Sequence, residues 1–169
     1  CLSDVFSVKT QSPRSLRIDP NRRPPTVNFR NHPPVKQIFL FDIDGTLIDS
    51  SGAGGAALQM ALREEFGITD PKPISLAGRT DRSIALEFFT HHQIEPTEAN
   101  WRRFRSAYLS RLGDLLPQRP GRILPGVRTL LQRLQQCASV AIGLLTGNVE
   151  EGARRKLTHF GLHHHFEVG

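Results

Sequence analysis

The chain has 169 residues, enough for one ordinary domain or for a small domain with an insertion. Its hydrophobic fraction of 38% and charged fraction of 22% are typical of a globular protein, and no apolar run approaches the roughly 20 residues of a membrane span. No charged-then-apolar signal sequence opens the chain either, so we expect a cytoplasmic protein without a membrane partner. Five of the six net positive charges lie in residues 1–36 and not in the rest of the chain, so we expect no nucleic-acid partner.

Residues 1–36 differ in composition from the rest of the chain. They are rich in Pro, Ser, Asn and Arg, and they lack the apolar periodicity of a helix or a strand. Such a segment cannot bury enough apolar surface to offset the loss of conformational entropy on folding. We therefore predict a disordered basic arm.

Residues 38–41 form an apolar run that predicts a strand buried on both faces, as in parallel sheets. Asp42 and Asp44 follow it, and residues two apart on a strand share a side. Two close carboxylates favour either a hard cation such as Mg²⁺ or a nucleophile beside an acid/base. Gly45 allows a sharp turn, and Thr46 adds a hydroxyl and an N–H. The alternative is an ordinary Asp-Gly turn after a strand.

Three helices are predicted next, near residues 52–66, 81–92 and 97–112, from apolar residues at helical spacing. No strand is predicted between them. A run of helices after a single buried strand indicates a helical module inserted into an α/β domain.

Arg79 lies in the loop before the second of these helices. A guanidinium is suited to binding a carboxylate or a phosphate through two parallel hydrogen bonds. A surface ion pair explains the same residue equally well.

A second apolar run at residues 140–145 predicts another buried strand, and Thr146, Gly147 and Asn148 follow it. A hydroxyl and free backbone N–H groups at the start of a helix suit a phosphate group. The alternative is that Thr146 or Asn148 simply caps the helix predicted for residues 149–160. Considered alone, Lys156 in that helix is explained as a solvated surface charge.

The string Asp42-x-Asp44-Gly45-Thr46-Leu47 after a buried strand resembles the first motif of the haloacid dehalogenase-like superfamily of phosphatases and phosphomutases. The resemblance implies that Asp42 is the nucleophile, which becomes an aspartyl-phosphate. It implies that Asp44 protonates the leaving group and then activates water. It also implies a Mg²⁺ cofactor, with Asp42 and Asp44 among its ligands and Gly45 and Thr46 facing the substrate.

Two later stretches resemble further motifs of the same family, in the same order. Thr146, with Gly147 and Asn148, matches the phosphate-binding second motif, and Lys156 matches the Lys that neutralises the nucleophile and the phosphoryl oxygens. Arg79 lies in a Gly-Arg-Thr-Asp sequence that resembles a substrate-facing loop of phosphoglycolate phosphatase-like members.

The resemblance implies an α/β fold, a Rossmann-like core with a parallel sheet and an inserted α-helical cap of the C1 type. The expected core consists of residues 37–50 and 121–169, and the expected cap of residues 51–120, after the arm of residues 1–36. The family's fourth motif has no counterpart before Gly169, so we expect a truncated copy.

The expected reaction is Mg²⁺-dependent hydrolysis of a small phosphorylated metabolite, similar to phosphoglycolate, through an aspartyl-phosphate. A phosphomutase of the β-phosphoglucomutase kind is one alternative. A non-catalytic fragment that retains the fold is the other.

Overall fold

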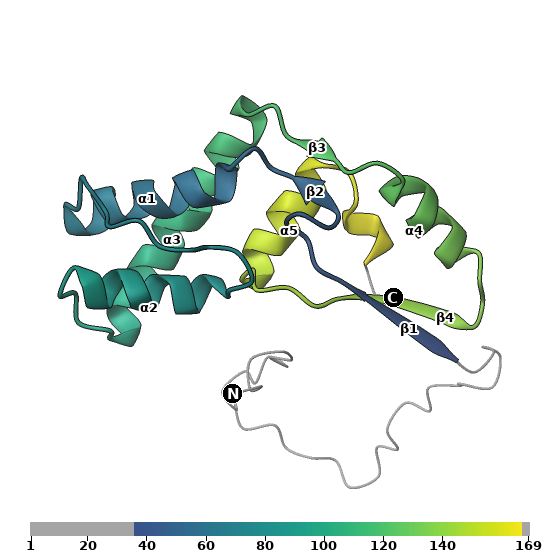
Figure 1. Ribbon diagram of the computed structural model, residues 1–169, viewed down its shortest axis with the longest axis horizontal. Coiled ribbons are helices and arrows are strands. Elements are labelled where there is room, and N and C mark those ends of the chain that lie inside the picture. The colour runs from purple at the N-terminus through teal and green to yellow at the C-terminus, as the bar shows by residue number, and fades with distance from the viewer. Residues whose placement is uncertain (1–35, 167–169) are drawn as a thin grey trace, which may run out of the picture. The chain divides into compact units, whose positions relative to one another are not determined.

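The computed structural model describes residues 36–166, which contain two small sheets. Strands β1 (Gln37–Phe41) and β4 (Val140–Leu144) pair in parallel, with Gln37 opposite Val140 and Phe41 opposite Leu144. Strands β2 (Ile48–Asp49) and β3 (Arg122–Ile123) pair antiparallel. Figure 1 shows β1 and β4 side by side, although about 100 residues separate them in the sequence.

Three helices lie between β2 and β3: α1 (Ala53–Phe66), α2 (Asp81–His91) and α3 (Glu98–Leu115). They agree with the three helices predicted near these residues. Helix α1 packs along α3, and all three helices contribute to one hydrophobic cluster. The largest fully buried side chains of this helical cluster are Leu62, Phe89, Phe104, Tyr108 and Leu112.

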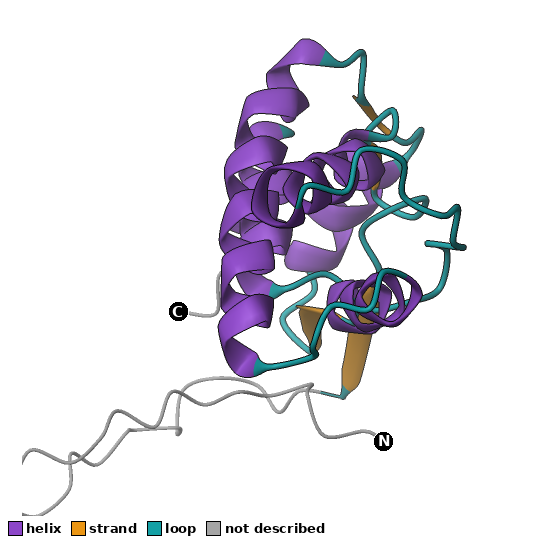
Figure 2. Ribbon diagram, turned by 90° about the vertical axis from the view of Figure 1, so that its left-hand side faces the viewer, coloured by secondary structure: helices purple, strands orange, loops and turns teal. Residues whose placement is uncertain are grey.

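A second hydrophobic cluster surrounds the strands. Helices α4 (Val127–Gln135) and α5 (Glu150–His159) belong to it, and the short 3₁₀ helices η2 (Leu116–Gln118) and η3 (His163–His165) complete the described elements. Seen from the side, the described chain is mostly helix and its strands are short (Figure 2). The fully buried members of this strand cluster are Ile43, Leu47, Ile48, Leu131, Leu157 and Leu162.

The helix ends follow local sequence signals. The Thr80 hydroxyl accepts a hydrogen bond from the Ser83 N–H at the start of α2, and the Thr97 hydroxyl accepts one from the Asn100 N–H at the start of α3. Gly67 ends α1 in the left-handed conformation, which glycine adopts without steric cost. Short-range capping thus fixes the entry into the two helices that follow α1.

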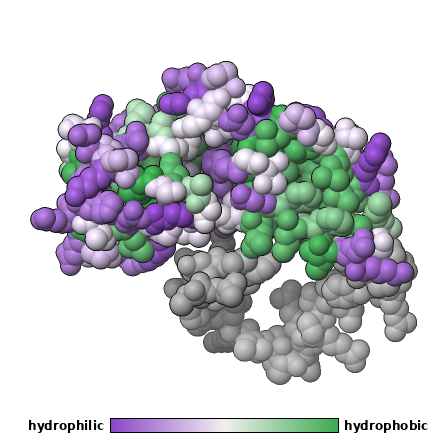
Figure 3. Space-filling view, in the orientation of Figure 1, coloured by the Kyte–Doolittle hydropathy of each residue, from purple (hydrophilic) through white to green (hydrophobic). Residues whose placement is uncertain are grey.

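Strand β1 is not buried on both faces, and that prediction is wrong. Ile38 is 69% exposed and Leu40 is 56% exposed. The reason is that β4 is the only strand paired with β1 within residues 36–166, and no other described element covers these side chains. In Figure 3 hydrophobic residues gather on the surface in the region where β1 and β4 lie in Figure 1.

The parallel strand pair flanked by helices confirms the predicted α/β class. The predicted arm, apart from Lys36, lies outside the described residues. The boundaries of the core and the cap stay predictions. None of the helices within residues 36–166 combines the length and the apolar character that crossing a membrane requires.

Candidate active site

The carboxyl ends of β1 and β4 bring two of the predicted site segments together. Phe41 and Leu144 are opposite each other at the last paired position, and the Leu145 N–H donates to the Phe41 carbonyl at 2.8 Å. Because the strands are parallel, the residues after each strand emerge at the same edge of the sheet. Asp42 and Thr146 therefore begin neighbouring loops.

The loop after β1 turns tightly. Gly45 has a φ of +79°, in the left-handed region, and its N–H donates to the Ile48 carbonyl at 2.8 Å. Ile43 and Leu47 are fully buried in the strand cluster, whereas Asp42 and Asp44 are exposed. The buried side chain of Ile43 therefore lies between two residues whose carboxylates are exposed.

Asp44, Asn148 and Lys156 form one hydrogen-bonded group. The Lys156 Nζ donates to Asp44 Oδ2 and to Asn148 Oδ1, each at 2.6 Å. The Asn148 Nδ2 donates to Asp44 Oδ2 and to the Thr146 hydroxyl, each at 2.8 Å. These contacts join the ends of β1 and β4 to helix α5. The structure therefore assembles four of the predicted site residues around one point.

Lys156 is almost fully buried, with 3% of its surface exposed. A buried ammonium must be paired and hydrogen-bonded, and Asp44 together with Asn148 supplies both. The ammonium contacts Asp44 and not Asp42, although the resemblance assigned it to the nucleophile. Asp42 itself makes no hydrogen bond or ion pair within residues 36–166, so its carboxylate is not held by a competing group.

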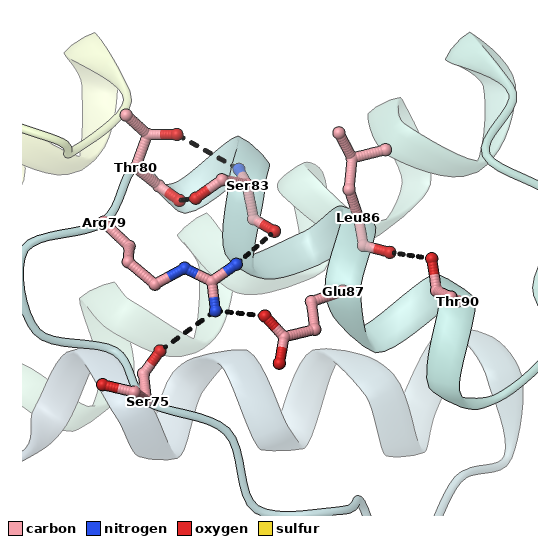
Figure 4. A network of polar contacts seen from close by, with 7 residues as sticks. All are labelled: Ser75, Arg79, Thr80, Ser83, Leu86, Glu87 and Thr90. Atoms are coloured by element: carbon pink, nitrogen blue, oxygen red, sulfur yellow. Dashed lines mark hydrogen bonds and ion pairs between the residues drawn. The ribbon is translucent and has the colours of Figure 1, made fainter.

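Arg79 points toward its own helical neighbours (Figure 4). Its guanidinium pairs with Glu87 and donates to the carbonyl oxygens of Ser75 at 3.3 Å and Ser83 at 3.1 Å. No hydrogen bond joins the Arg79 side chain to Asp42, Asp44 or Thr146 in the described structure. A substrate contact by Arg79 stays a prediction, and in this structure the guanidinium is occupied by an ion pair.

The backbone at Arg79 nevertheless touches the site. A Cβ atom added to Gly147 would lie 2.2 Å from the Arg79 carbonyl oxygen, a distance that no side chain can adopt without displacing one of the two loops. Glycine at position 147 is thus required by the close approach of residues 78–81 to residues 146–149. Gly147 contributes to the site by leaving room for the Arg79 carbonyl.

Asp81 is a site residue that the sequence analysis did not single out. Its Oδ2 accepts a hydrogen bond from the Val149 N–H at 2.8 Å, and its own N–H donates to the Gly147 carbonyl at 2.8 Å. The signal was present in the Gly-Arg-Thr-Asp sequence, which was interpreted for its arginine alone.

Burial controls the ionisation of Asp81 and Tyr108. Desolvation raises the pKa of Asp81, and the Val149 N–H, the Lys156 charge and the Tyr108 hydroxyl oppose that rise. Desolvation and the neighbouring Asp81 charge hold the pKa of Tyr108 well above its usual value of 10.0. The Tyr108 hydroxyl is therefore protonated at neutral pH.

The donor set of Asp42 and Asp44 fits Mg²⁺. Magnesium prefers oxygen ligands, and it commonly uses one or two carboxylates with waters and a substrate phosphate completing the shell. Within residues 36–166 no group of three or more His, Cys, Asp or Glu side chains could hold a metal ion on its own. The two carboxylates suit a shared site of this kind better than an all-protein cage.

A family model described as haloacid dehalogenase-like hydrolase matches residues 39–168. A search of curated proteins found no match. The matched segment contains both strand ends and α5, so it covers every residue of the candidate site.

Solved structures share the fold. A protein described as a predicted phosphoglycolate phosphatase from Haemophilus somnus 129PT is 21% identical with a TM-score of 0.53, and the match covers 79% of this chain and 60% of that one. The haloacid dehalogenase-like protein SP0104 from Streptococcus pneumoniae is 24% identical with a TM-score of 0.52, covering 78% and 58%. CbbY from Rhodobacter sphaeroides, in complex with phosphate, is 16% identical with a TM-score of 0.60, covering 78% and 61%.

These likenesses confirm the predicted Rossmann-like fold of the family. In each case the match spans about three-fifths of the length of the solved chain.

Proposed function

This chain belongs to the haloacid dehalogenase-like hydrolase family, and from that membership we propose that it hydrolyses a small phosphomonoester similar to phosphoglycolate. The observation that carries the proposal is the convergence of Asp44, Thr146, Asn148 and Lys156 beside the free carboxylate of Asp42. These four residues supply hydrogen-bond donors and a cation that suit a phosphoryl group, which supports the proposal of a nucleophile two residues before Asp44.

Asp42 is the proposed nucleophile. One of its carboxylate oxygens attacks phosphorus in line, the bond to the leaving alcohol breaks, and Asp44 gives that alcohol a proton. A water molecule then attacks phosphorus of the aspartyl-phosphate and gives a proton to Asp44, and the bond between phosphorus and the Asp42 oxygen breaks. Inorganic phosphate leaves, and both carboxyl groups return to their starting state.

The remaining site residues hold the phosphoryl charge. Thr146, Asn148 and the backbone N–H groups around Gly147 donate hydrogen bonds to the phosphoryl oxygens, and Lys156 supplies a positive charge at their side. In this role the Lys156 ammonium donates hydrogen bonds both to Asp44 and to the substrate. The backbone of Gly45 and Thr46, in the turn after Asp44, and the guanidinium of Arg79 are the further substrate contacts of this proposal.

Mg²⁺ is the proposed cofactor, with Asp42 and Asp44 as its protein ligands. When bound, a divalent cation neutralises negative charge on the phosphoryl oxygens and on the nearby carboxylates. The donor chemistry of the two carboxylates supports this choice. A cytoplasmic location, a core of residues 37–50 and 121–169 and a cap of residues 51–120 belong to the same proposal.

Phosphate release from phosphoglycolate or an aryl phosphate, measured with and without Mg²⁺, tests the proposal. Asp42→Asn removes the nucleophile and keeps its size, so we expect activity to fall by a factor on the order of 10³ or more. Asp70→Asn is the matched control, because Asp70 is an exposed loop carboxylate outside the site. Equal inactivity of the wild type and Asp42→Asn would contradict catalysis by this chain and would leave its family membership intact.

A further inference from the structure

Two backbone segments far apart in the sequence are tied together beside the candidate site. Residues 78–81 precede α2, and residues 146–149 connect β4 with α5. The Asp81 N–H donates to the Gly147 carbonyl and the Asp81 carboxylate accepts from the Val149 N–H, both at 2.8 Å. The two bonds run in opposite directions, so they fix both the distance and the relative orientation of the two segments.

The first segment is held firmly on its own side. Arg79 is anchored by Ser75, Ser83 and Glu87, and the Thr80 hydroxyl accepts from the Ser83 N–H at 3.1 Å (Figure 4). These contacts hold residues 78–81 in place, and Asp81 at the end of this segment contacts residues 147–149.

Asp81 supplies a hydrogen-bond acceptor at the start of α5. Val149 is the N-cap residue of α5 and its side chain makes no capping hydrogen bond, so the first N–H groups of the helix need an outside acceptor. The Asp81 carboxylate, only 8% exposed, takes the Val149 N–H and places a negative charge near the positive end of the helix.

We propose that Asp81 is a positioning residue, which fixes residues 147–149 and the first turn of α5 so that Asn148 and Lys156 face Asp44. The role rests on the proposed function, because it concerns the same phosphoryl-binding site. Asp81 touches neither Asp42 nor Asp44. It acts through the loop that carries Asn148 and through the helix that carries Lys156 seven residues after Val149.

Two measurements on the full chain test this role: the hydrogen-exchange rate of the Val149 amide by NMR, and the binding of inorganic phosphate in the presence of Mg²⁺. Asp81→Ala is expected to raise both the exchange rate and the dissociation constant for phosphate by roughly tenfold or more, because a hydrogen bond to a charged group is lost. Asp81→Asn keeps an oxygen that can accept the Val149 N–H, and it is expected to recover part of both losses.

Glu98→Ala is the matched control. Glu98 stands in the first turn of α3 as Asp81 does in α2, but it is exposed and pairs with Arg82. We expect it to change neither measurement. Circular dichroism identifies a variant that fails to fold, and Asp81→Asn then carries the comparison.

An unchanged Val149 exchange rate in Asp81→Ala would overturn the proposed contact. Faster exchange with unchanged phosphate affinity would reduce Asp81 to a structural residue and would overturn its positioning role. A wild-type chain that binds no phosphate would contradict the proposed function, and the positioning role with it. The exchange rate would still decide separately whether Asp81 holds Val149.

Discussion

Among single residues, Lys156 is a charged side chain of the site that is only 3% exposed. Burying an ammonium is unfavourable unless an opposite charge and hydrogen bonds replace the lost water. Asp44 and Asn148 do so, but the side chain of Asp44 is itself 42% exposed, so water weakens their attraction. A buried cation whose partner is open to solvent can turn to an incoming phosphoryl group at little further cost in desolvation.

Replacing Lys156 with Met tests this assignment. We expect phosphate release to fall by about 10²-fold or more, because one positive donor to the phosphoryl oxygens is lost. Arg154→Met is the control on the same helix, since Arg154 is an exposed side chain that pairs with Glu151 on that helix. Steady-state rates of both variants provide the measurement, and comparable losses in the two would refute a specific role for Lys156.

Asp81 makes a second prediction at this scale, through the pH dependence of stability. Burial raises the pKa of Asp81 above its ordinary value of 3.8, so the folded state binds its proton more tightly than the unfolded state does. The free energy of unfolding contributed by this group therefore falls as the pH rises from 3.8 through the pKa of the folded state.

Asp81→Asn removes that titration. We expect the stability of the wild type, relative to Asp81→Asn, to decrease as the pH rises above 3.8, as measured by urea unfolding at several pH values. A difference that grows with pH would show instead that the hydrogen bonds to the carboxylate outweigh its desolvation.

At the level of elements, the site depends on how closely the loop before α2 approaches the loop after β4. Gly147 permits this approach because no side chain fits between it and the Arg79 carbonyl. Helix α5 then begins beside Asp81 and carries Lys156 back toward β1. Two short loops and one helix thus determine the position of four side chains.

Gly147→Ala should separate the two loops. We expect the free energy of unfolding to fall by about 1–3 kcal/mol, since backbone atoms must shift to admit the added methyl group. Gly54→Ala is the matched control: it lies within α1, and its new Cβ would meet no atom closer than the Lys156 Nζ at 3.4 Å. Alanine there should be neutral or stabilising by up to about 1 kcal/mol. Chemical unfolding of both variants gives the comparison, and equal stabilities would contradict the tight contact.

For the molecule as a whole, apolar surface is distributed unevenly. The helical cluster and the strand cluster each have fully buried members, whereas β1 leaves large apolar side chains open to water. Within residues 36–166 one edge of β1 has no strand partner, and an exposed apolar edge of this kind favours association between chains.

Ile38→Thr tests that exposure. Threonine keeps the β-branched shape and removes apolar surface from a side chain that is 69% exposed, so we expect stability to change by less than about 0.5 kcal/mol and self-association to weaken. Leu131→Ala, at a fully buried position, is expected to cost about 2–5 kcal/mol. Light scattering and urea unfolding measure the two effects. A large loss of stability in Ile38→Thr would mean that β1 is covered.

The sequence by itself determined the α/β class, the three helices between the two parallel strands, and the family to which the chain belongs. These features depend on local signals: apolar periodicity, capping residues and motifs of a few residues. The order of Asp42, Thr146 and Lys156 along the chain is likewise a feature of the sequence alone. Periodicity also overstated the burial of β1, because an apolar run records what a strand can bury and not what covers it.

Only the tertiary structure decided the partners of the charged groups. Lys156 pairs with Asp44, 112 residues away, and the Asp81 carboxylate accepts from Val149, 68 residues away. Arg79 is bound by Glu87 within the helical part. Such pairings depend on where distant loops meet and on how much water each group loses there, and neither quantity is encoded within a short stretch of sequence.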